Sequence, residues 1–283
     1  MAVFDPRRRL LAGWLLGLCL SPVVWGQAPP AMSAAEVIEK NAAARGGVQA
    51  WQGLKTMAWT GYVESAVQGR KLPFLLEQKR PNMTRFEIVN DGQRSIRLFD
   101  GKSGWKLRPN PANGRPELST YSEDELSFAR GAQVINGPLM DYVAKGAIVT
   151  VSGNGQADGR YAYILDVKPP SGGNHRIWVD AETFLEVRHD RQVRSGLGQL
   201  GTVTVIFRDY REFEGVKIPT KIETGAGIGA SANKLVIERV ALNPELEDRI
   251  FARPDTPVSR KKSIVVDTRN SGSATGPAPS KQP

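Results

Sequence analysis

From Thr56 to Leu242, apolar residues recur at every second position in short runs separated by turn-forming residues. This period of two is typical of β-strands with one buried face. Consecutive runs have no helical segment between each pair, which excludes a doubly wound parallel sheet. We therefore expect about 11 or 12 antiparallel strands. A flat sheet of that size would expose its edges and one apolar face, so we predict an unclosed half-barrel.

Helix signals frame the strands. Ser33 and Glu36 have the spacing of a capping box, and Gly46-Gly47 ends the helix that it starts. A short turn over residues 48–54 leads into the first strand.

Two further helices are predicted between the fifth and sixth expected strands. Ser122 with Glu125 starts the first of them, which ends near Gly131. Asn136 is the expected N-cap of the second, over residues 137–145. The predicted class is thus mainly β with a helical lid (α+β), in which the N-terminal helix and two inserted helices cover the concave face.

A two-residue turn at Gln68-Gly69 predicts a hairpin that pairs Val63 with Phe74. In that register the large apolar side chains of both strands share one face, as a half-buried hairpin requires. These residues are Met57, Trp59, Val63, Phe74 and Leu76.

The next hairpin contains Asn90, Asp91 and Gly92 between two alternating runs. A three-residue loop with Gly92 in the left-handed conformation pairs Phe86 with Ile96. We therefore expect both side chains on the concave face.

The chain divides into three parts. Residues 1–28 have a basic start, a short apolar run and small residues at the end, which predicts a cleavable secretory signal. Residues 29–254 form the domain, and residues 255–283 are rich in Pro, Ser and Gly and are expected to be disordered. Cys19 lies within the signal, so the mature chain is expected to lack cysteine. Lipid anchoring at Cys19 is the less favoured alternative because Leu18 precedes it where a small residue is usual.

The formal net charge of +9 does not indicate nucleic-acid binding. The two terminal segments carry more than half of it, and along the strands basic residues alternate with acidic ones. A nucleic-acid-binding protein would gather them on one element.

Gly196, Gly198 and Gly201 have the G-x-G-x-x-G spacing of a dinucleotide site. Such a site requires a helix after the glycines, whose N-terminus faces the phosphates. Residues 202–210 have the alternation of a strand, and the glycine-rich residues 225–230 also lie between two strands. We therefore predict hairpin loops, no nucleotide and no cofactor.

His175 and His189 are the only histidines. A hairpin that pairs Val179 with Leu185 places the two imidazoles on one face. Zinc sites require three or four ligands, and Asp190 points to the other face by alternation. We therefore expect ordinary polar residues at a strand end and no metal site.

No catalytic constellation is evident. The sequence contains no G-x-S-x-G nucleophile elbow, and Glu123, Asp124 and Glu125 are favourable charges at a helix N-terminus. We predict that the protein is not an enzyme. A hydrolase or isomerase that uses the two histidines is the alternative, and it would lose activity on substitution of either.

Large apolar residues on the strands either fill the core or leave a concave face that holds an apolar guest. The second hypothesis assigns guest contacts to residues of the first strands and of the inserted helices. These candidates are Trp59, Val63, Phe74, Leu76, Phe86, Ile96, Leu126, Phe128, Leu139, Met140 and Val143.

A family resemblance rests on six stretches of the chain, residues 34–47, 100–109, 137–146, 178–190, 209–223 and 241–254. In this order they resemble the outer-membrane lipoprotein-sorting proteins of the LolA/LolB-like family. The resemblance implies a half-barrel covered by helices. Carriers of the family hold the lid with an arginine; Arg85 and Arg97 lie on nearby strands, but no motif matches either position.

The resemblance also implies a function. We expect a monomeric periplasmic carrier of lipids or acylated lipoproteins, with donor and acceptor proteins at the inner and outer membranes. Transfer would be non-covalent and gated by the lid. The alternative is an envelope sensor or assembly factor whose half-barrel binds a partner protein or peptide, because a fold alone does not fix function.

Overall fold

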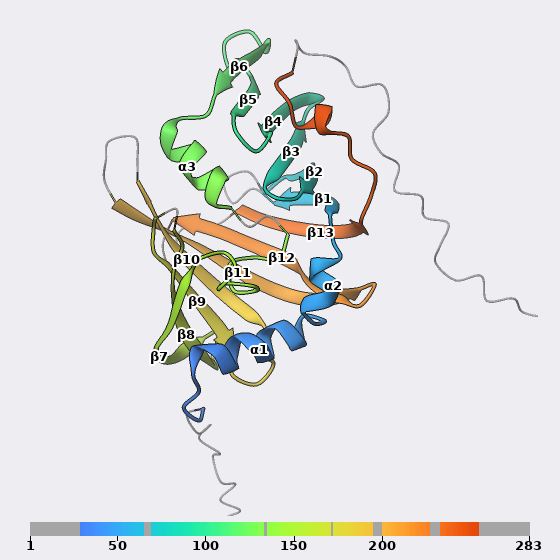
Figure 1. The fold of residues 1–283 in the computed structure, drawn as a ribbon. Helices are drawn as coiled ribbons and strands as arrows, with labels where there is room; N and C mark the ends of the chain where they lie inside the picture. The colour runs from blue at the N-terminus through green and yellow to red at the C-terminus, as the bar shows by residue number, and fades with distance from the viewer. Residues whose placement is uncertain are drawn as a thin grey trace, which may run out of the picture.

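The protein, seen in a computed structural model, is a 13-stranded antiparallel sheet that curves around a concave face (Figure 1). The structure describes residues 29–64, 69–132, 135–170, 172–194, 200–226 and 233–254. The strands are β1 Thr56–Glu64, β2 Lys71–Lys79, β3 Met83–Asn90, β4 Gln93–Phe99, β5 Gly104–Pro109, β6 Pro116–Thr120, β7 Ile148–Ala157, β8 Arg160–Lys168, β9 His175–Asp180, β10 Glu186–Arg194, β11 Leu200–Phe213, β12 Val216–Ala226 and β13 Asn233–Leu242. The helices are α1 Ala34–Ala44, α2 Val48–Gln52, α3 Glu123–Gly131 and the 3₁₀ turn η1 Asp248–Ile250.

The strand order is β6-β5-β4-β3-β2-β1-β13-β12-β11-β10-β9-β8-β7. The chain runs outward from β1 to the edge strand β6, crosses to the other edge at β7, and returns to pair β13 with β1. Residues 121–147 make this crossing, and we call them the crossing segment. Because β6 and β7 do not pair with each other, the barrel stays open. The predicted class, an unclosed antiparallel half-barrel with a helical cover, is confirmed.

Strand β6 is the element that the sequence analysis missed. It begins with Pro116, which pairs with Pro109 at the end of β5. Proline donates no backbone hydrogen bond and is tolerated at the start of an edge strand. The prolines that indicated a loop are therefore compatible with an edge strand.

The first hairpin has the predicted face but not the predicted register. Val63 pairs with Leu72, and Trp59 pairs with Leu76. This is a shift of two residues, which leaves every side chain on the same face. The loop is longer than the two residues expected, and the turn at residues 65–68 lies outside the described residues.

The second hairpin is shifted by one residue, and its predicted register was wrong. Asn90 pairs with Gln93, which leaves a two-residue turn of Asp91 and Gly92, with φ values of 49° and 76°. Two left-handed residues suit the right-handed twist of a hairpin, and Asp-Gly is a favoured pair for them. Phe86 consequently faces Arg97, and Ile96 lies on the opposite face of the sheet.

The histidine hairpin carries a β-bulge between Glu186 and Arg188. An extra residue on one strand shifts the pairing beyond it. His189 therefore pairs with Ile177, and not with His175 as predicted. The shift is again two residues, so the prediction that both histidines share one face is confirmed.

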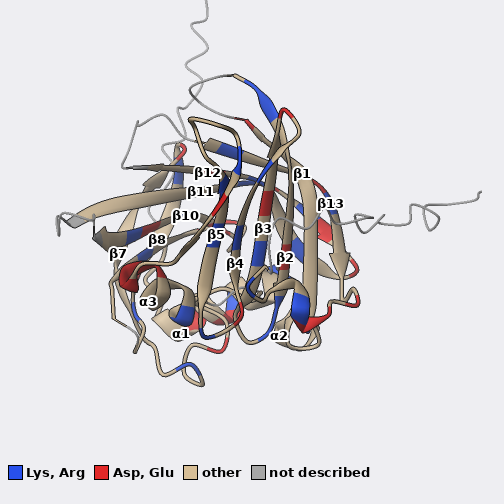
Figure 2. Ribbon diagram, turned by 90° about the horizontal axis from the view of Figure 1, so that it is seen from above, with Lys and Arg blue, Asp and Glu red and all other residues tan. Residues whose placement is uncertain are grey.

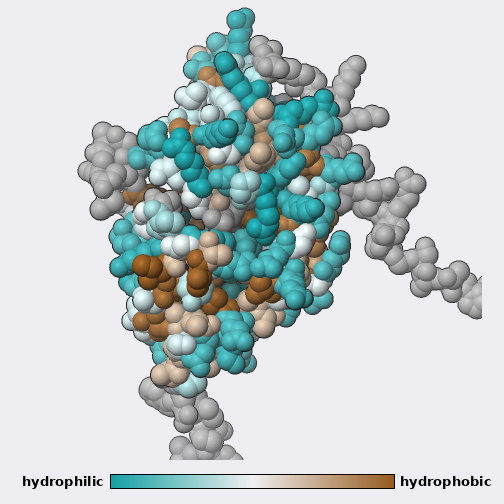
Figure 3. Space-filling model, in the orientation of Figure 1, coloured by the Kyte–Doolittle hydropathy of each residue, from teal (hydrophilic) through white to brown (hydrophobic). Residues whose placement is uncertain are grey.

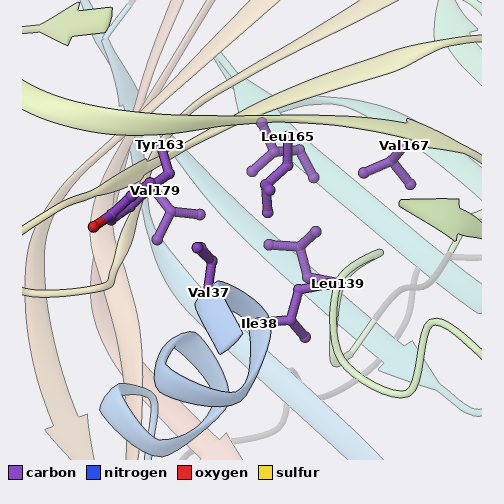
Figure 4. Packing of buried hydrophobic residues seen from close by; sticks show 8 residues of the cluster. Val37, Ile38, Leu139, Tyr163, Leu165, Val167 and Val179 are labelled. Atoms are coloured by element: carbon purple, nitrogen blue, oxygen red, sulfur yellow. The ribbon is translucent and has the colours of Figure 1, made fainter. Parts of the chain in front are cut away.

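Helix α1 covers the lower part of the concave face. Ser33 and Glu36 form the predicted capping box at its start. Its Val37 and Ile38 are buried against β8 and β9, as Figure 4 shows. The members of this first core cluster are Val37, Ile38, Leu139, Tyr163, Leu165, Val167, Ile177 and Val179.

Two more clusters lie along the sheet. The second joins α1, α2, the crossing segment and β12, and consists of Ala42, Trp51, Leu54, Met57, Ile135, Met140, Val216 and Ile218. The third lies where β1, β2 and β13 meet. It consists of Val63, Phe74 and Ile237 with half-buried neighbours that include Trp59, Leu76, Phe86, Ile88, Ile222 and Leu235.

The predicted helix over residues 137–145 is absent, because residues 135–146 form turns. Asp141 has a φ of 56° and Gly137 a φ of 73°, which a continuous helix does not allow. The neighbours Leu139 and Met140 are buried in two different clusters. Tertiary packing thus prevails over the local pattern. The first inserted helix, α3, is confirmed with its Ser122–Glu125 capping box.

The predicted signal, Cys19 and the C-terminal tail lie outside the described residues, as do most of the two glycine-rich loops. Gly201 belongs to β11, so a strand follows these glycines and not a helix. Within the described part of the chain, no helix is both long and apolar enough to cross a membrane. Figure 2 shows basic and acidic residues side by side on β2 to β5 (Figure 2).

We expect Gly46 to tolerate no side chain. Its φ is 107°, and a Cβ there would collide with the carbonyl oxygen of Gly215. Gly46→Ala should lower the free energy of unfolding by about 2 kcal/mol or more, measured by urea denaturation. Gly47 has a φ of 90° with open space around it. Gly47→Ala should therefore lose only the free energy of holding alanine in this backbone conformation, without a steric clash. Gly53→Ala, in helical conformation, should have little effect. Equal losses at Gly46 and Gly47 would show that contact with Gly215 is no constraint.

Candidate functional site

A cavity of about 940 Å³ lies between the concave face of the sheet and the crossing segment. Small-molecule sites typically enclose roughly 300–1,000 Å³. Part of its apolar lining, which we call the floor, comes from Trp59 on β1, Val193 on β10, Phe207 on β11 and Ile222 on β12. Trp59 and Ile222 also pack against the third core cluster, so the floor continues into the half-buried side chains around that cluster. The sheet thus presents an incompletely covered apolar surface.

Helix α3 covers this cavity through polar contacts. Glu125 accepts hydrogen bonds from Arg97 Nη2 at 2.8 Å and from Lys106 Nζ at 2.7 Å. Asn82 donates to the carbonyl oxygen of Arg130 at 3.1 Å. Although burial alone would raise the pKa of Glu125, these hydrogen bonds and the one from Ser122 lower it to about 2. Ion pairs therefore hold α3 to β4 and β5.

The underside of α3 carries little apolar packing. Phe128 is 50% exposed, and Leu126 is half-buried. The Phe128 ring lies 4.2 Å from the guanidinium carbon of Arg191 on β10. In Figure 1, α3 lies between the upper strands β3 to β6 and the lower strands β7 to β12.

The turns over residues 135–146 are held more firmly. The buried Arg45, at the end of α1, donates to the carbonyl oxygen of Asn136 at 3.2 Å and to Glu186 Oε1 at 3.3 Å. Its guanidinium carbon lies 4.2 Å from the Trp51 ring. Burial raises the pKa of Glu186, and the nearby Arg45 and Lys145 oppose that rise. Arg45 thus connects α1, the crossing segment and β10.

Lys145 supports the same turns from below. It donates to the carbonyl oxygen of Gly137 at 2.7 Å and to that of Met140. Burial lowers the pKa of Lys145 to about 8, and Arg80 and Arg45 act in the same direction. A charged donor on two carbonyl groups stabilises these turns.

The two histidines form a half-buried pair at another part of the cavity wall. His175 Nδ1 and His189 Nε2 are 2.8 Å apart, and the ring centroids are 5.0 Å apart. Burial lowers the pKa of both, and the neighbouring Arg191 adds to this; the pKa of His189 falls to about 3. The pair is therefore uncharged at neutral pH.

The two histidine side chains are hydrogen-bonded to each other. Asp190, the nearest acid in sequence, accepts hydrogen bonds from Arg188 and Thr204. The relay of nucleophile, histidine and carboxylate that acyl hydrolysis requires is not formed among the described residues. The described residues also contain no cluster of three or more potential metal ligands among His, Cys, Asp and Glu.

The candidate contact residues fall into separate groups. Trp59 and Phe128 line the cavity. Four others, Val63, Phe74, Leu76 and Phe86, belong to or pack against the third core cluster beside the floor. Leu126 lies on α3.

The other candidates do not face the cavity. Leu139 and Met140 are fully buried in the first two core clusters. Val143 is 72% exposed. Figure 3 shows that hydrophobic residues gather on the lower part of the face seen in Figure 1 (Figure 3). Ile96 lies on the opposite face of the sheet because of the corrected register.

Of the two arginines considered for the lid, Arg97 contacts α3 through Glu125. Arg85 is buried on the opposite face between Glu77 and Glu87. The sequence analysis missed Arg191 and Arg45. Arg191 lies two residues after His189, and this period-two spacing could have placed it on the same face. Arg45 had no local signal, because its partner Glu186 lies 141 positions away.

No protein-family model and no curated protein matches the chain. Among solved structures, it is similar to a LolA superfamily protein from Nitrosomonas europaea, with a TM-score of 0.51, 16% identity, and coverage of 79% of this chain and 99% of the other. A putative outer-membrane lipoprotein-sorting protein domain from Vibrio parahaemolyticus has a TM-score of 0.49 and 12% identity, over 76% and 94% of the two chains. A DUF1329 family protein from Desulfovibrio piger has a TM-score of 0.49 and 15% identity, over 80% and 98%. The similarity to the first of these structures shows that the protein has a LolA-like fold, as its sequence motifs predicted.

We expect Glu125→Gln to release α3 without unfolding the sheet. Trypsin cleavage at Arg130 should become several-fold faster, and the urea midpoint should change little. Asp124→Asn, which removes a first-turn charge with no ion pair among the described residues, is the matched control. Because the folded-state pKa of Glu125 is about 2, its contribution is complete above about pH 4.5 and is lost as the pH falls toward 2. Equal cleavage rates in both variants would contradict this role.

The histidine pair should make stability depend on pH. The unfolded chain protonates His189 below about pH 6.5, whereas the folded protein resists protonation down to about pH 3. Stability should therefore fall as the pH decreases through this window, by at most about 1.4 kcal/mol per pH unit for each histidine. His189→Gln should show a flatter profile in urea denaturation between pH 7.5 and 5.0. Parallel profiles would exclude the pair as the cause.

Proposed function

We propose that this protein with a LolA-like fold is a non-covalent carrier or binder of lipids or acylated lipoproteins in the periplasm. The observation that carries the proposal is the cavity of about 940 Å³ whose floor is apolar and half-covered. An acyl chain on this floor would be removed from water at a gain of roughly 0.8 kcal/mol per methylene.

The way in which α3 is held supports gated transfer. Its contacts to Arg97, Lys106 and Asn82 are polar. Such contacts exchange for water at small net cost when they open. A guest can therefore enter or leave past α3 while the rest of the cover stays in place.

The proposed path begins with export. The signal sequence would direct the chain to the periplasm, where it would receive its guest from an inner-membrane donor and deliver it to an outer-membrane acceptor. The apolar floor favours an acyl guest over the alternative of a sensor or assembly factor, whose concave face should be polar.

The first test is native mass spectrometry of the protein purified from the envelope of its own organism, followed by organic extraction. Lipid or acylated peptide at roughly one equivalent is the expected result, since one cavity holds one guest. An empty cavity with a co-purifying protein would overturn the carrier proposal and favour the sensor or assembly factor.

Ile222→Asn tests the floor directly. Placing an amide there should weaken binding of N-phenyl-1-naphthylamine, an uncharged apolar fluorophore, by roughly ten-fold, because about 1.4 kcal/mol of apolar contact is lost. Val143→Asn introduces the same amide at a side chain that is 72% exposed and should leave the fluorescence titration unchanged. An equal effect of both substitutions, or none, would contradict the assignment of the floor.

A further inference from the structure

Among the described residues, Arg191 is the cation of the cavity wall that has no ion pair or hydrogen bond. The other lysines and arginines of the lining are Arg45, Arg97, Arg130 and Lys145, and each has an ion pair or a hydrogen bond to carbonyl oxygens. Among the described residues, Arg191 has neither, and its buried Nε has no hydrogen-bond partner. Its guanidinium carbon lies 4.2 Å from the centroid of the Phe128 ring, in a cation–π contact.

Arg191 is half-buried, and a guanidinium that is partly removed from water without a carboxylate is costly unless something else compensates its charge. Burial lowers the pKa of Arg191, but arginine remains charged in proteins. The nearby acids are already used: Asp190 binds Arg188 at 2.9 Å and Asp166 binds Arg176 at 2.7 Å. This part of the cavity wall is therefore electropositive.

The histidine pair adds a hydrogen-bond donor beside Arg191. In the 2.8 Å contact one ring donates to the other. Two neutral imidazoles then keep one further N–H group between them, whichever ring is the donor. His175 pairs with Arg191 across β9 and β10, so both groups lie at the same level of the sheet.

These groups line the same cavity as the apolar floor. Val193 of the floor lies two residues after Arg191 on β10 and shares its face. A molecule with one charged end and one apolar chain could therefore contact both parts of the lining. The fork of an arginine matches the two oxygens of a carboxylate or phosphate.

We propose that Arg191 and the His175–His189 pair bind the single anionic group, a carboxylate or phosphate, of an amphiphile whose chain lies on the floor. The assignment rests on the proposed function, because it uses the same cavity. It adds that the cavity selects its guest by charge. An anionic amphiphile is bound more tightly than a neutral ester with the same chain.

Dodecanoate and methyl dodecanoate separate the two proposals, because they share a chain and differ in charge. At pH 7.5 the protein should bind dodecanoate at least ten-fold more tightly by isothermal titration calorimetry. Arg191→Gln should reduce dodecanoate affinity about ten-fold and leave the ester unchanged. Arg70→Gln removes the same charge at an exposed ion pair with Asp91 and should not alter the ratio.

The outcomes are distinct. Equal binding of acid and ester by the unsubstituted protein, or an equal loss of both in Arg191→Gln, would overturn the anion site and leave the carrier proposal intact. Binding of neither ligand would overturn both. Displacement of dodecanoate by an equal concentration of inorganic phosphate would show a site for a free anion, and not for the head group of an amphiphile.

Stability provides an independent check on Arg191. If Arg191 serves to bind a ligand, its unpaired charge does not stabilise the ligand-free protein. The urea midpoint of ligand-free Arg191→Gln should therefore equal or exceed that of the unsubstituted protein. A lower midpoint would indicate a structural role and would count against the proposal.

Discussion

The pairing of β1 with β13 determines most of the architecture. It joins Met57 to Leu242 and places the first and last strands at the centre of the sheet. Both outer edges, β6 and β7, then belong to strands that follow each other in the chain. The segment between them must cross from one edge to the other, and in a curved sheet the short route lies over the concave face. A covered cavity is thus a consequence of the strand order.

Buried charges decide which part of this cover is fixed. Arg45 and Lys145 hold the turns over residues 135–146, and Leu139 and Met140 anchor those turns in two core clusters. Helix α3, by contrast, depends on Glu125 and its two cations. Buried ionic contacts that lose one partner are costly, whereas half-exposed ones exchange readily for water. The cover therefore combines a rigid part with a releasable one.

Local patterns were sufficient for the fold and insufficient for the site. Period-two alternation predicted every strand except β6, and the capping boxes at Ser33 and Ser122 predicted two of the three inserted or leading helices. The predicted registers were wrong where a bulge or an Asp-Gly turn changed the number of residues between paired positions. At the Asp-Gly turn, this error placed Ile96 on the wrong face of the sheet in the prediction. The turns around Leu139 and the contact between Arg45 and Glu186 depend on residues distant in sequence. No local pattern encodes such contacts.

The sheet has two arms, β1 to β6 and β7 to β13, which meet where β1 pairs with β13. The arms differ from this central pairing in how they can fold. Within each arm, strands pair with their immediate neighbours in the chain, as hairpins do. The β1–β13 ladder instead joins the ends of the domain. Contacts between near neighbours form early and at low entropic cost, whereas distant ones close a large loop. The arms should therefore gain structure first, and their union, which completes the concave surface, should set the folding rate. During synthesis from the N-terminus, the cavity would thus stay unformed until β13 has emerged.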